Sequence, residues 1–289
     1  MDARNRIEQA LEMAVNRAAG SEAPPKLSEA LRHAVFPGGA RVRPRLCLAV
    51  AKACGDDAPE MSNAAATACE LLHCASLVHD DLPAFDNADI RRGKPSVHRA
   101  YGEPIAVLAG DALIVLAFET LAHAAASAPH RLPALTMIVS RAVGMPCGIT
   151  AGQAWESEPV ADLSVYQRAK TGALFVGSAM AGASAAGADP EDWRLLGERL
   201  GEAYQVADDV RDAIADAREM GKPAGQDIVH DRPNAVTRLG LPAAVDRLEG
   251  LVAGAIVAIP SCPGEDDLRA LVMAEAKRLT PKSLAQFAA

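Results

Sequence analysis

The sequence predicts an all-α fold, a single-domain bundle of roughly ten or more helices that spans residues 1–289. Half of the residues are hydrophobic but only 3% are aromatic, so the core must be built from Ala, Leu and Val. Alanine is the best helix former. No short window alternates apolar and polar residues with β-branched enrichment, so we expect no sheet. The absence of a linker, a repeat or a low-complexity tract favours one domain.

Proline and glycine divide the N-terminal half into helices, because they end or interrupt helical segments. Residues 6–35 read as an amphipathic helix with one interruption, ended by the Pro-Gly-Gly at 37–39. Pro44 is placed for the first turn of the next helix, whose residues 46–53 are apolar. Residues 61–79 are almost continuously apolar, which predicts a buried helix.

A polar stretch, residues 84–104, comes next, and its glycines and prolines predict a loop. Residues 105–126 and 132–143 are apolar and helical in pattern. Residues 163–186 form a helix rich in Ala and Gly, and residues 195–220 a longer amphipathic one. The tail beyond these divides into two or three shorter helices at its prolines.

Composition excludes several classes of function. The net charge of −8 argues against binding to nucleic acid or to an anionic membrane surface. The N-terminal segment lacks the apolar run of a signal peptide. No run of about 18 residues is free of charges and helix breakers, so no membrane span is expected. Six cysteines without CxxC spacing indicate buried free thiols in a reducing cytoplasm.

The first stretch that carries chemistry is LVHDDLPAFDNADIRRGK, residues 77–94. It places Asp80, Asp81 and Asp86 close together and follows them with Arg91 and Arg92. Like charges so close repel one another unless a cation binds between them. Carboxylates suit Mg²⁺, which proteins commonly share with substrate phosphates, and arginine forks match phosphate oxygens. The stretch therefore indicates a diphosphate held by magnesium.

A second acidic cluster, QVADDVRD, lies far along the chain. Asp208 and Asp212 share one helix face, and Gln205 lies on it one turn earlier. Either cluster alone is typical of a solvated helix cap. The two clusters together, with the basic residues beside the first, favour a site in which they face one another.

The first cluster needs a bend in the chain. Asp80 and Asp86 are too far apart in sequence to share the face of a straight helix. Pro83 predicts that the helix loosens after Asp81 and that the following loop brings Asp86 back.

These motifs resemble those of the trans-polyprenyl diphosphate synthases. HDDLPAFDNADIRRGKPSVH is similar to the first aspartate-rich motif of that family in its bacterial DDxxxxD form, and QVADDVRD to the second, DDxxD. PGGARVRP, KTGALF and GKPAGQD resemble other family blocks in the right order. The resemblance covers nearly the whole chain and is closest to bacterial geranylgeranyl diphosphate synthases of carotenoid pathways. It implies the isoprenoid synthase fold, with a central cavity, and a homodimer.

The resemblance also assigns roles to individual residues. It implies about three Mg²⁺ ions per site. The implied metal ligands are Asp80, Asp86 and Asp208, joined in the catalytic set by Asp81, Asp209, Asp212 and Lys170. The implied contacts to isopentenyl diphosphate are Arg43, His73 and Arg92. The implied contacts on the allylic side are Arg91, Lys170, Thr171, Gln205 and Lys222, and Arg232 keeps a positive charge where the family usually has lysine.

The implied reaction is ionisation, condensation and elimination. Metal ions make the allylic diphosphate a good leaving group, the double bond of isopentenyl diphosphate attacks the cation, and the diphosphate accepts the proton. His73 and His98 are candidate bases by chemistry, but we favour ligand contact for His73 and a structural role for His98.

Product length is expected to depend on Ala75 and Ser76, one turn before Asp80. Bacterial relatives that make a fifteen-carbon product typically carry an aromatic residue at the position of Ala75, so the small side chain predicts twenty carbons. The alternative is ordinary helix packing at Ala75.

Three other functions stay open at this point: a farnesyl diphosphate synthase, a terpene cyclase and a non-catalytic subunit. A cyclase has no need of a second diphosphate site. One observation supports a non-catalytic subunit: Ala40 stands where the family usually has a lysine that contacts isopentenyl diphosphate. Losing that contact costs about 1.5–3 kcal/mol unless Arg41 or Arg45 replaces it.

Overall fold

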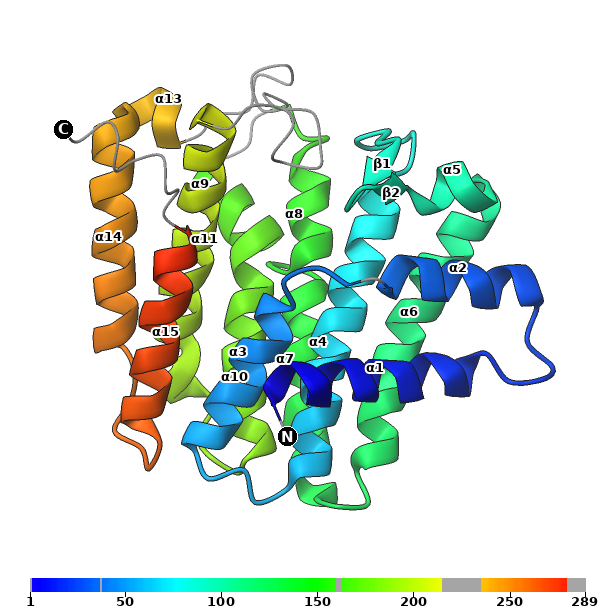
Figure 1. The fold of residues 1–289 in the computed structure, drawn as a ribbon, viewed down its shortest axis with the longest axis horizontal. Coiled ribbons are helices and arrows are strands. Elements are labelled where there is room, and N and C mark those ends of the chain that lie inside the picture. Colours follow the sequence, from blue (N-terminus) through cyan, green and yellow to red (C-terminus); the bar gives the residue numbers. More distant parts are fainter. Residues whose placement is uncertain (1, 37, 160–162, 215–234, 280–289) are drawn as a thin grey trace.

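The computed structural model describes residues 2–36, 38–159, 163–214 and 235–279, and its elements are almost all helices (Figure 1). The first half contains α1 (Ala3–Ala18), α2 (Pro25–Val35), α3 (Val42–Ala53), α4 (Pro59–Asp80), β1 (Ile90–Arg91), β2 (Lys94–Pro95), α5 (Val97–Tyr101) and α6 (Glu103–Ala124). The second half contains η1 (Pro129–Arg131), α7 (Leu132–Val143), α8 (Ile149–Trp155), α9 (Leu163–Gln167), η2 (Arg168–Gly172), α10 (Ala173–Ala185), η3 (Glu191–Trp193), α11 (Arg194–Ile214), α13 (Ala235–Leu239), α14 (Leu241–Val257) and α15 (Glu265–Leu279). The all-α prediction is confirmed.

The prediction that residues 84–104 form a loop without strands is wrong. This stretch contains a two-stranded antiparallel hairpin, β1–β2, in which Arg91 pairs with Lys94, and then α5. Arg92 and Gly93 form the turn with φ of 53° and 76°, as a two-residue hairpin turn requires. Strands of two residues are too short to show a period in sequence, which explains why they escaped prediction. The short helix α8 was also missed.

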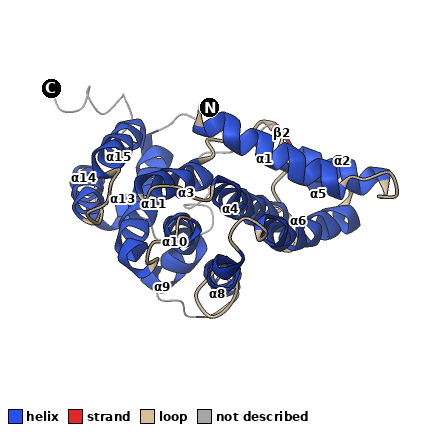
Figure 2. Cartoon of the chain, turned by 90° about the horizontal axis from the view of Figure 1, so that it is seen from below, coloured by secondary structure: helices blue, strands red, loops and turns tan. Residues whose placement is uncertain are grey.

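Two apolar helices form the centre of the bundle. Seen from below, α4 lies between α3 and α6, and α10 is flanked by α3 and α11 (Figure 2). Small residues allow this close packing: a Cβ at Gly182 in α10 would lie 2.3 Å from the Cys47 carbonyl oxygen in α3. Because α4 and α10 are buried almost all round, the polar residues at their ends are held by a rigid core.

All six cysteines are free, but not all are buried as the sequence suggested. Cys47, Cys69 and Cys74 are buried, whereas Cys147 is exposed. Among the described helices, one, α6, is long and apolar enough to cross a membrane, and only part of it is buried against the bundle.

The elements that carry the acidic and basic motifs converge at one end of the bundle. The C-terminal ends of α4 and α11 and the β1–β2 hairpin all lie towards the top of Figure 1. The central cavity stays a prediction. Among the described residues, one pocket lies beside the hairpin and another lies between α3 and α15.

Candidate active site

The predicted bend after the first aspartates is present. Helix α4 ends at Asp80, with Asp81 as its C-cap residue. The backbone N–H of Asp86 donates to the Asp80 carbonyl oxygen at 2.9 Å, and that of Ala88 donates to the Asp81 carbonyl at 3.1 Å. The loop thus turns back over the helix end and brings the Asp86 carboxylate to that of Asp80.

A third carboxylate, Glu156, completes this group and was missed by the sequence analysis. Glu156 is the C-cap residue of α8. One oxygen from each of Asp80, Asp86 and Glu156 can be chosen so that all lie within 4.8 Å of one another. Oxygen donors of this kind fit Mg²⁺. A single glutamate after a short helix carries no recognisable motif, so only the fold could reveal it.

Lys170 forms ion pairs with two carboxylates of this group. Its Nζ lies 2.7 Å from Glu156 Oε1 and 3.4 Å from Asp80 Oδ1. The Tyr166 hydroxyl donates to the same Glu156 oxygen at 2.6 Å, and the Gln153 side-chain amide donates to Asp80. Burial raises the pKa of Asp80, and the Lys170 charge opposes that rise. The group is therefore an ion-paired network in which Glu156 receives two donors.

The backbone around Lys170 is unusual. Residues Arg168–Gly172 form one π-helical turn, η2, between α9 and α10. Such turns insert an extra residue and are frequent at functional sites. Helix α8 packs directly on this turn, since a Cβ at Gly152 would lie 2.4 Å from the Lys170 backbone nitrogen. This close backbone contact fixes how far Glu156, at the end of α8, lies from Lys170.

Asp81 has a different neighbourhood from Asp80. It is buried and accepts hydrogen bonds from the Arg91 guanidinium, with Nε at 2.9 Å from Oδ1 and 3.2 Å from Oδ2. Burial raises the pKa of Asp81, and Arg91 opposes the rise. The structure thus uses Asp81 to orient Arg91, which agrees with the supporting role expected for this aspartate.

Arg43 and His73 form a basic group beside the end of α4. Arg43 Nη1 lies 3.4 Å from His73 Nε2, and its guanidinium lies 4.7 Å from the centre of the Phe175 ring. Burial and the neighbouring arginines hold the pKa of His73 well below its ordinary value, so the ring is neutral and accepts from Arg43. Burial also lowers the pKa of Arg43, while the charges of Glu70 and Asp208 oppose that change.

The second acidic cluster divides into a buried and an exposed aspartate. Asp209 is only 1% exposed and accepts from the Gln205 amide at 2.9 Å and from the Ala235 backbone N–H at 2.7 Å. It therefore joins α11 to the start of α13. The Gln205 carbonyl oxygen in turn accepts from the Thr171 hydroxyl at 2.8 Å.

Asp208 is the exposed member, with 52% of its side chain accessible, and it forms an ion pair with Arg211. The Asp208 charge nevertheless acts on Arg43, because it opposes the lowering of the Arg43 pKa by burial. Asp212 lies one turn further along α11 and is half-buried. The predicted contacts of Lys222 and Arg232 lie outside the described residues.

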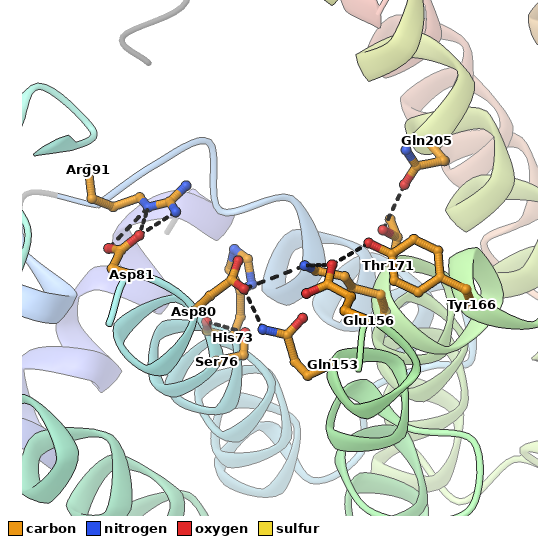
Figure 3. A network of polar contacts seen from close by, with 11 residues as sticks. His73, Ser76, Asp80, Asp81, Arg91, Gln153, Glu156, Tyr166, Thr171 and Gln205 are labelled. Atoms are coloured by element: carbon orange, nitrogen blue, oxygen red, sulfur yellow. Dashed lines mark hydrogen bonds and ion pairs between the residues drawn. The ribbon is translucent and has the colours of Figure 1, made fainter. Parts of the chain in front are cut away.

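The two clusters lie on opposite sides of η2. Lys170 contacts Asp80 of the first cluster, and the next residue, Thr171, donates to Gln205 of the second (Figure 3). This arrangement agrees with the expectation that residues 170 and 171 line a site between the clusters.

The remaining predicted positions lie on α4 and α5. Ala75 is 2% exposed within the main core cluster, and the Ser76 hydroxyl donates to the His73 carbonyl at 2.8 Å. His98 is buried in α5 with Nδ1 3.0 Å from the Ser96 hydroxyl, which agrees with a structural role.

Neither arginine near Ala40 is free to replace the missing lysine. Arg41 is buried and ion-paired with Glu8 and Glu70. Arg45 forms an ion pair with Glu275 of α15 at 2.6 Å.

The described part of the chain is an almost entirely helical bundle with carboxylates gathered at one end, and its fold is that of the isoprenoid synthases, since solved members of that fold superimpose on it. Residues 24–249 match the family model described as polyprenyl synthetase. The chain is 58% identical over 280 residues to a geranylgeranyl diphosphate synthase of Cereibacter sphaeroides, covering 97% of each chain. It is 55% identical over 274 residues to a geranylgeranyl diphosphate synthase of Rhodobacter capsulatus, covering 95% of each.

A solved structure is also similar to this chain. The geranyltransferase of Helicobacter pylori, crystallised with magnesium and isoprenyl diphosphate, superimposes with a TM-score of 0.81 at 30% identity, over 96% of each chain. The chain belongs to the polyprenyl synthetase family.

Proposed function

We propose that this protein is a geranylgeranyl diphosphate synthase, a trans-prenyltransferase that condenses isopentenyl diphosphate with allylic diphosphates. The observation that carries the proposal is the placement of Lys170 and Thr171 between two acidic clusters, with the Arg43–His73 group beside them. The two bacterial relatives above carry this name at more than half identity over nearly the full chain, which favours it over the farnesyl and cyclase alternatives.

The carboxylates at the site suit magnesium. Asp80 and Asp86 would hold it on one side and Asp208 on the other, and Glu156 offers a further oxygen beside the first pair. When bound, Mg²⁺ supplies Lewis-acid neutralisation of the allylic diphosphate as it departs. We propose that the carboxylates of the two clusters would hold about three such ions per site.

The chain's own residues would then bind, orient and shield the substrates. Arg91, oriented by Asp81, and Lys170 would hold the allylic diphosphate through charge-assisted hydrogen bonds. The hydroxyl of Thr171 and the amide oxygen of Gln205, which are hydrogen-bonded to one another, would supply fixed dipoles for a developing allylic cation. His73 is neutral and surrounded by arginines, which suits contact with isopentenyl diphosphate better than proton removal.

A single assay tests the proposal. The purified protein is incubated with radiolabelled isopentenyl diphosphate, an allylic primer and Mg²⁺, and the hydrolysed products are separated by chromatography. We expect label in a twenty-carbon alcohol. A fifteen-carbon product would indicate a farnesyl diphosphate synthase, and no incorporation at any Mg²⁺ concentration would indicate a non-catalytic subunit.

We further propose a cytoplasmic homodimer joined through α6. Its exposed side chains include Val107, Leu108 and Val115, a mainly apolar strip on the face turned away from the bundle that also contains exposed Asp111. Strips of this kind on a soluble enzyme are typical of subunit interfaces. Sedimentation should give twice the monomer mass, and Val115→Asp should shift it towards the monomer, whereas Met13→Asp, also on an exposed apolar residue, should not.

A further inference from the structure

A buried carboxylate beneath the basic group has no part in the reaction proposed above. Glu70 lies on α4, one turn before His73, and is 1% exposed. A carboxylate so deeply buried is unfavourable unless cations and hydrogen bonds surround it. Its positively charged neighbours among the described residues are three arginines: Arg41 in contact, Arg92 at 4.0 Å and Arg43 within reach of its charge. The Cys74 thiol also donates to Glu70 Oε1 at 3.9 Å.

Arg41 is the fixed member of this group. Its Nη1 lies 2.6 Å from Glu70 Oε1, its Nε and Nη2 lie 2.9 and 3.2 Å from the two oxygens of Glu8, and its Nη2 also donates to the Val35 carbonyl at 2.8 Å. Its backbone has φ of 51°. With every nitrogen bonded to the protein, Arg41 is a part of the scaffold.

Arg92 is more exposed than Arg41 and contacts Glu70 at the longer distance of 4.0 Å. A Cβ at Gly39 would lie 3.0 Å from Arg92 Nε, so the guanidinium packs against bare backbone. At Gly38 a Cβ would lie 2.1 Å from Arg41 Cζ. The two glycines thus make room for one guanidinium each, and Glu70 lies between those guanidiniums.

We propose that Glu70 is a positioning residue, whose buried carboxylate holds Arg92 and Arg43 in the arrangement that receives the diphosphate of isopentenyl diphosphate. The inference rests on the proposed function. Without this negative charge Arg41 would repel the two arginines, because buried like charges interact strongly. The carboxylate also maintains the charge of buried Arg43, as the pKa of that arginine indicates.

Removing the charge of Glu70 has two opposite effects on the binding of isopentenyl diphosphate. Loss of a nearby negative charge by itself would strengthen binding of an anionic substrate. Loss of positioning would weaken it. Because the Glu70–Arg41 contact is short and buried, we expect positioning to dominate in Glu70→Gln.

The experiment compares steady-state kinetics of the wild type, Glu70→Gln, Glu70→Asp and Glu8→Gln with each substrate varied in turn. We expect Glu70→Gln to raise KM for isopentenyl diphosphate about tenfold or more, the effect of losing one charge-assisted hydrogen bond. KM for the allylic substrate should stay within about twofold, since Asp81 and not Glu70 orients Arg91. Glu70→Asp, which keeps the charge, should recover part of the loss.

Glu8→Gln is the matched control, because it weakens the other ion pair of Arg41 at a side chain one-third exposed. It should lower the melting temperature without changing either KM. If it raises KM for isopentenyl diphosphate as much as Glu70→Gln does, Glu70 acts only through the fold and the inference is wrong.

If Glu70→Gln does not fold, a second variant tests the same inference. Gly39→Ala pushes on Arg92 without altering any charge and should raise the same KM selectively. An unchanged or lower KM for isopentenyl diphosphate in the folded Glu70 variants and in Gly39→Ala would overturn the inference. An inactive wild type would instead overturn the proposed function.

Discussion

Glu156 is the residue whose role the structure defines most sharply, and Glu156→Gln is the most informative perturbation. The change keeps the shape of the side chain but removes its charge. Glu156 accepts from Lys170 at 2.7 Å and from Tyr166 at 2.6 Å, with its side chain 19% exposed. A hydrogen bond to a charged group contributes about 1.5–3 kcal/mol, or roughly a 10- to 150-fold change in an equilibrium constant.

Partial exposure and the second contact of Lys170 with Asp80 reduce that range to its lower end. We therefore expect kcat/KM for the allylic substrate to fall about 10- to 30-fold. The loss of a nearby oxygen donor should also raise the Mg²⁺ concentration needed for half-maximal rate, because Glu156 lies within 4.8 Å of the Asp80 and Asp86 ligand atoms.

The assay is the initial rate of label transfer from isopentenyl diphosphate, measured over a series of Mg²⁺ concentrations. Tyr166→Phe is the matched control, since it removes a neutral donor from Glu156 and leaves the charge. It should cost about 0.5–1.5 kcal/mol and leave the Mg²⁺ dependence unchanged. Activity of Glu156→Gln within twofold of the wild type, with the same Mg²⁺ dependence, would refute the reasoning.

Four further predictions follow from the same geometry. EDTA should abolish label transfer and added Mg²⁺ restore it, and Asp80→Asn should raise the Mg²⁺ requirement, whereas an unchanged titration would contradict its place in the site. Ala75→Tyr should shorten the product to fifteen carbons by chromatography and, because the position is buried, lower stability by about 1–3 kcal/mol; an unchanged product would leave only the packing role. His73 is neutral when folded but has an ordinary pKa near 6.5 when unfolded, so the unfolded state binds the extra proton and stability falls as pH drops below about 6.5, by at most about 1.4 kcal/mol per unit. The melting temperature of His73→Gln should therefore fall less between pH 7 and pH 5.5 than that of the wild type, and parallel curves would argue against a neutral His73. Gly152→Ala should cost about 1–3 kcal/mol in chemical denaturation and reduce activity through the Lys170 backbone, and wild-type values would show that α8 can yield.

The sequence was sufficient for the features that depend on local pattern. Helical periodicity and the prolines and glycines between helices predicted α1 to α4, α6 and α7 to within a few residues, and the start of α11 to within one. The helix predicted over residues 163–186 is divided into α9, η2 and α10, and the predicted end of the next helix at residue 220 lies outside the described residues. The fold-back of Asp86 onto Asp80 was predicted from Pro83, because a helix can continue past a proline only at a cost. The motifs were also sufficient to indicate a diphosphate and magnesium site.

The hairpin and α8 could not be predicted, for a physical reason. A two-residue strand has no period, and its turn requires Arg92 in a left-handed conformation, which is unfavourable for a residue with a Cβ and cannot be predicted from its type. The sequence also could not distinguish the surroundings of adjacent aspartates in one motif. Asp80 contacts Lys170, while Asp81 orients Arg91. In the second motif Asp209 is buried, while Asp208 is exposed.

The sequence by itself determined the fold class, the acidic and basic motifs and the chemistry that they share, since these depend on residue type and on spacing along one helix. Only the tertiary structure decided that Glu156 joins Asp80 and Asp86, and that Glu70 lies beneath the arginines. These partners come from separate helices, and a distance between side chains on different helices is set by packing, which no single segment encodes.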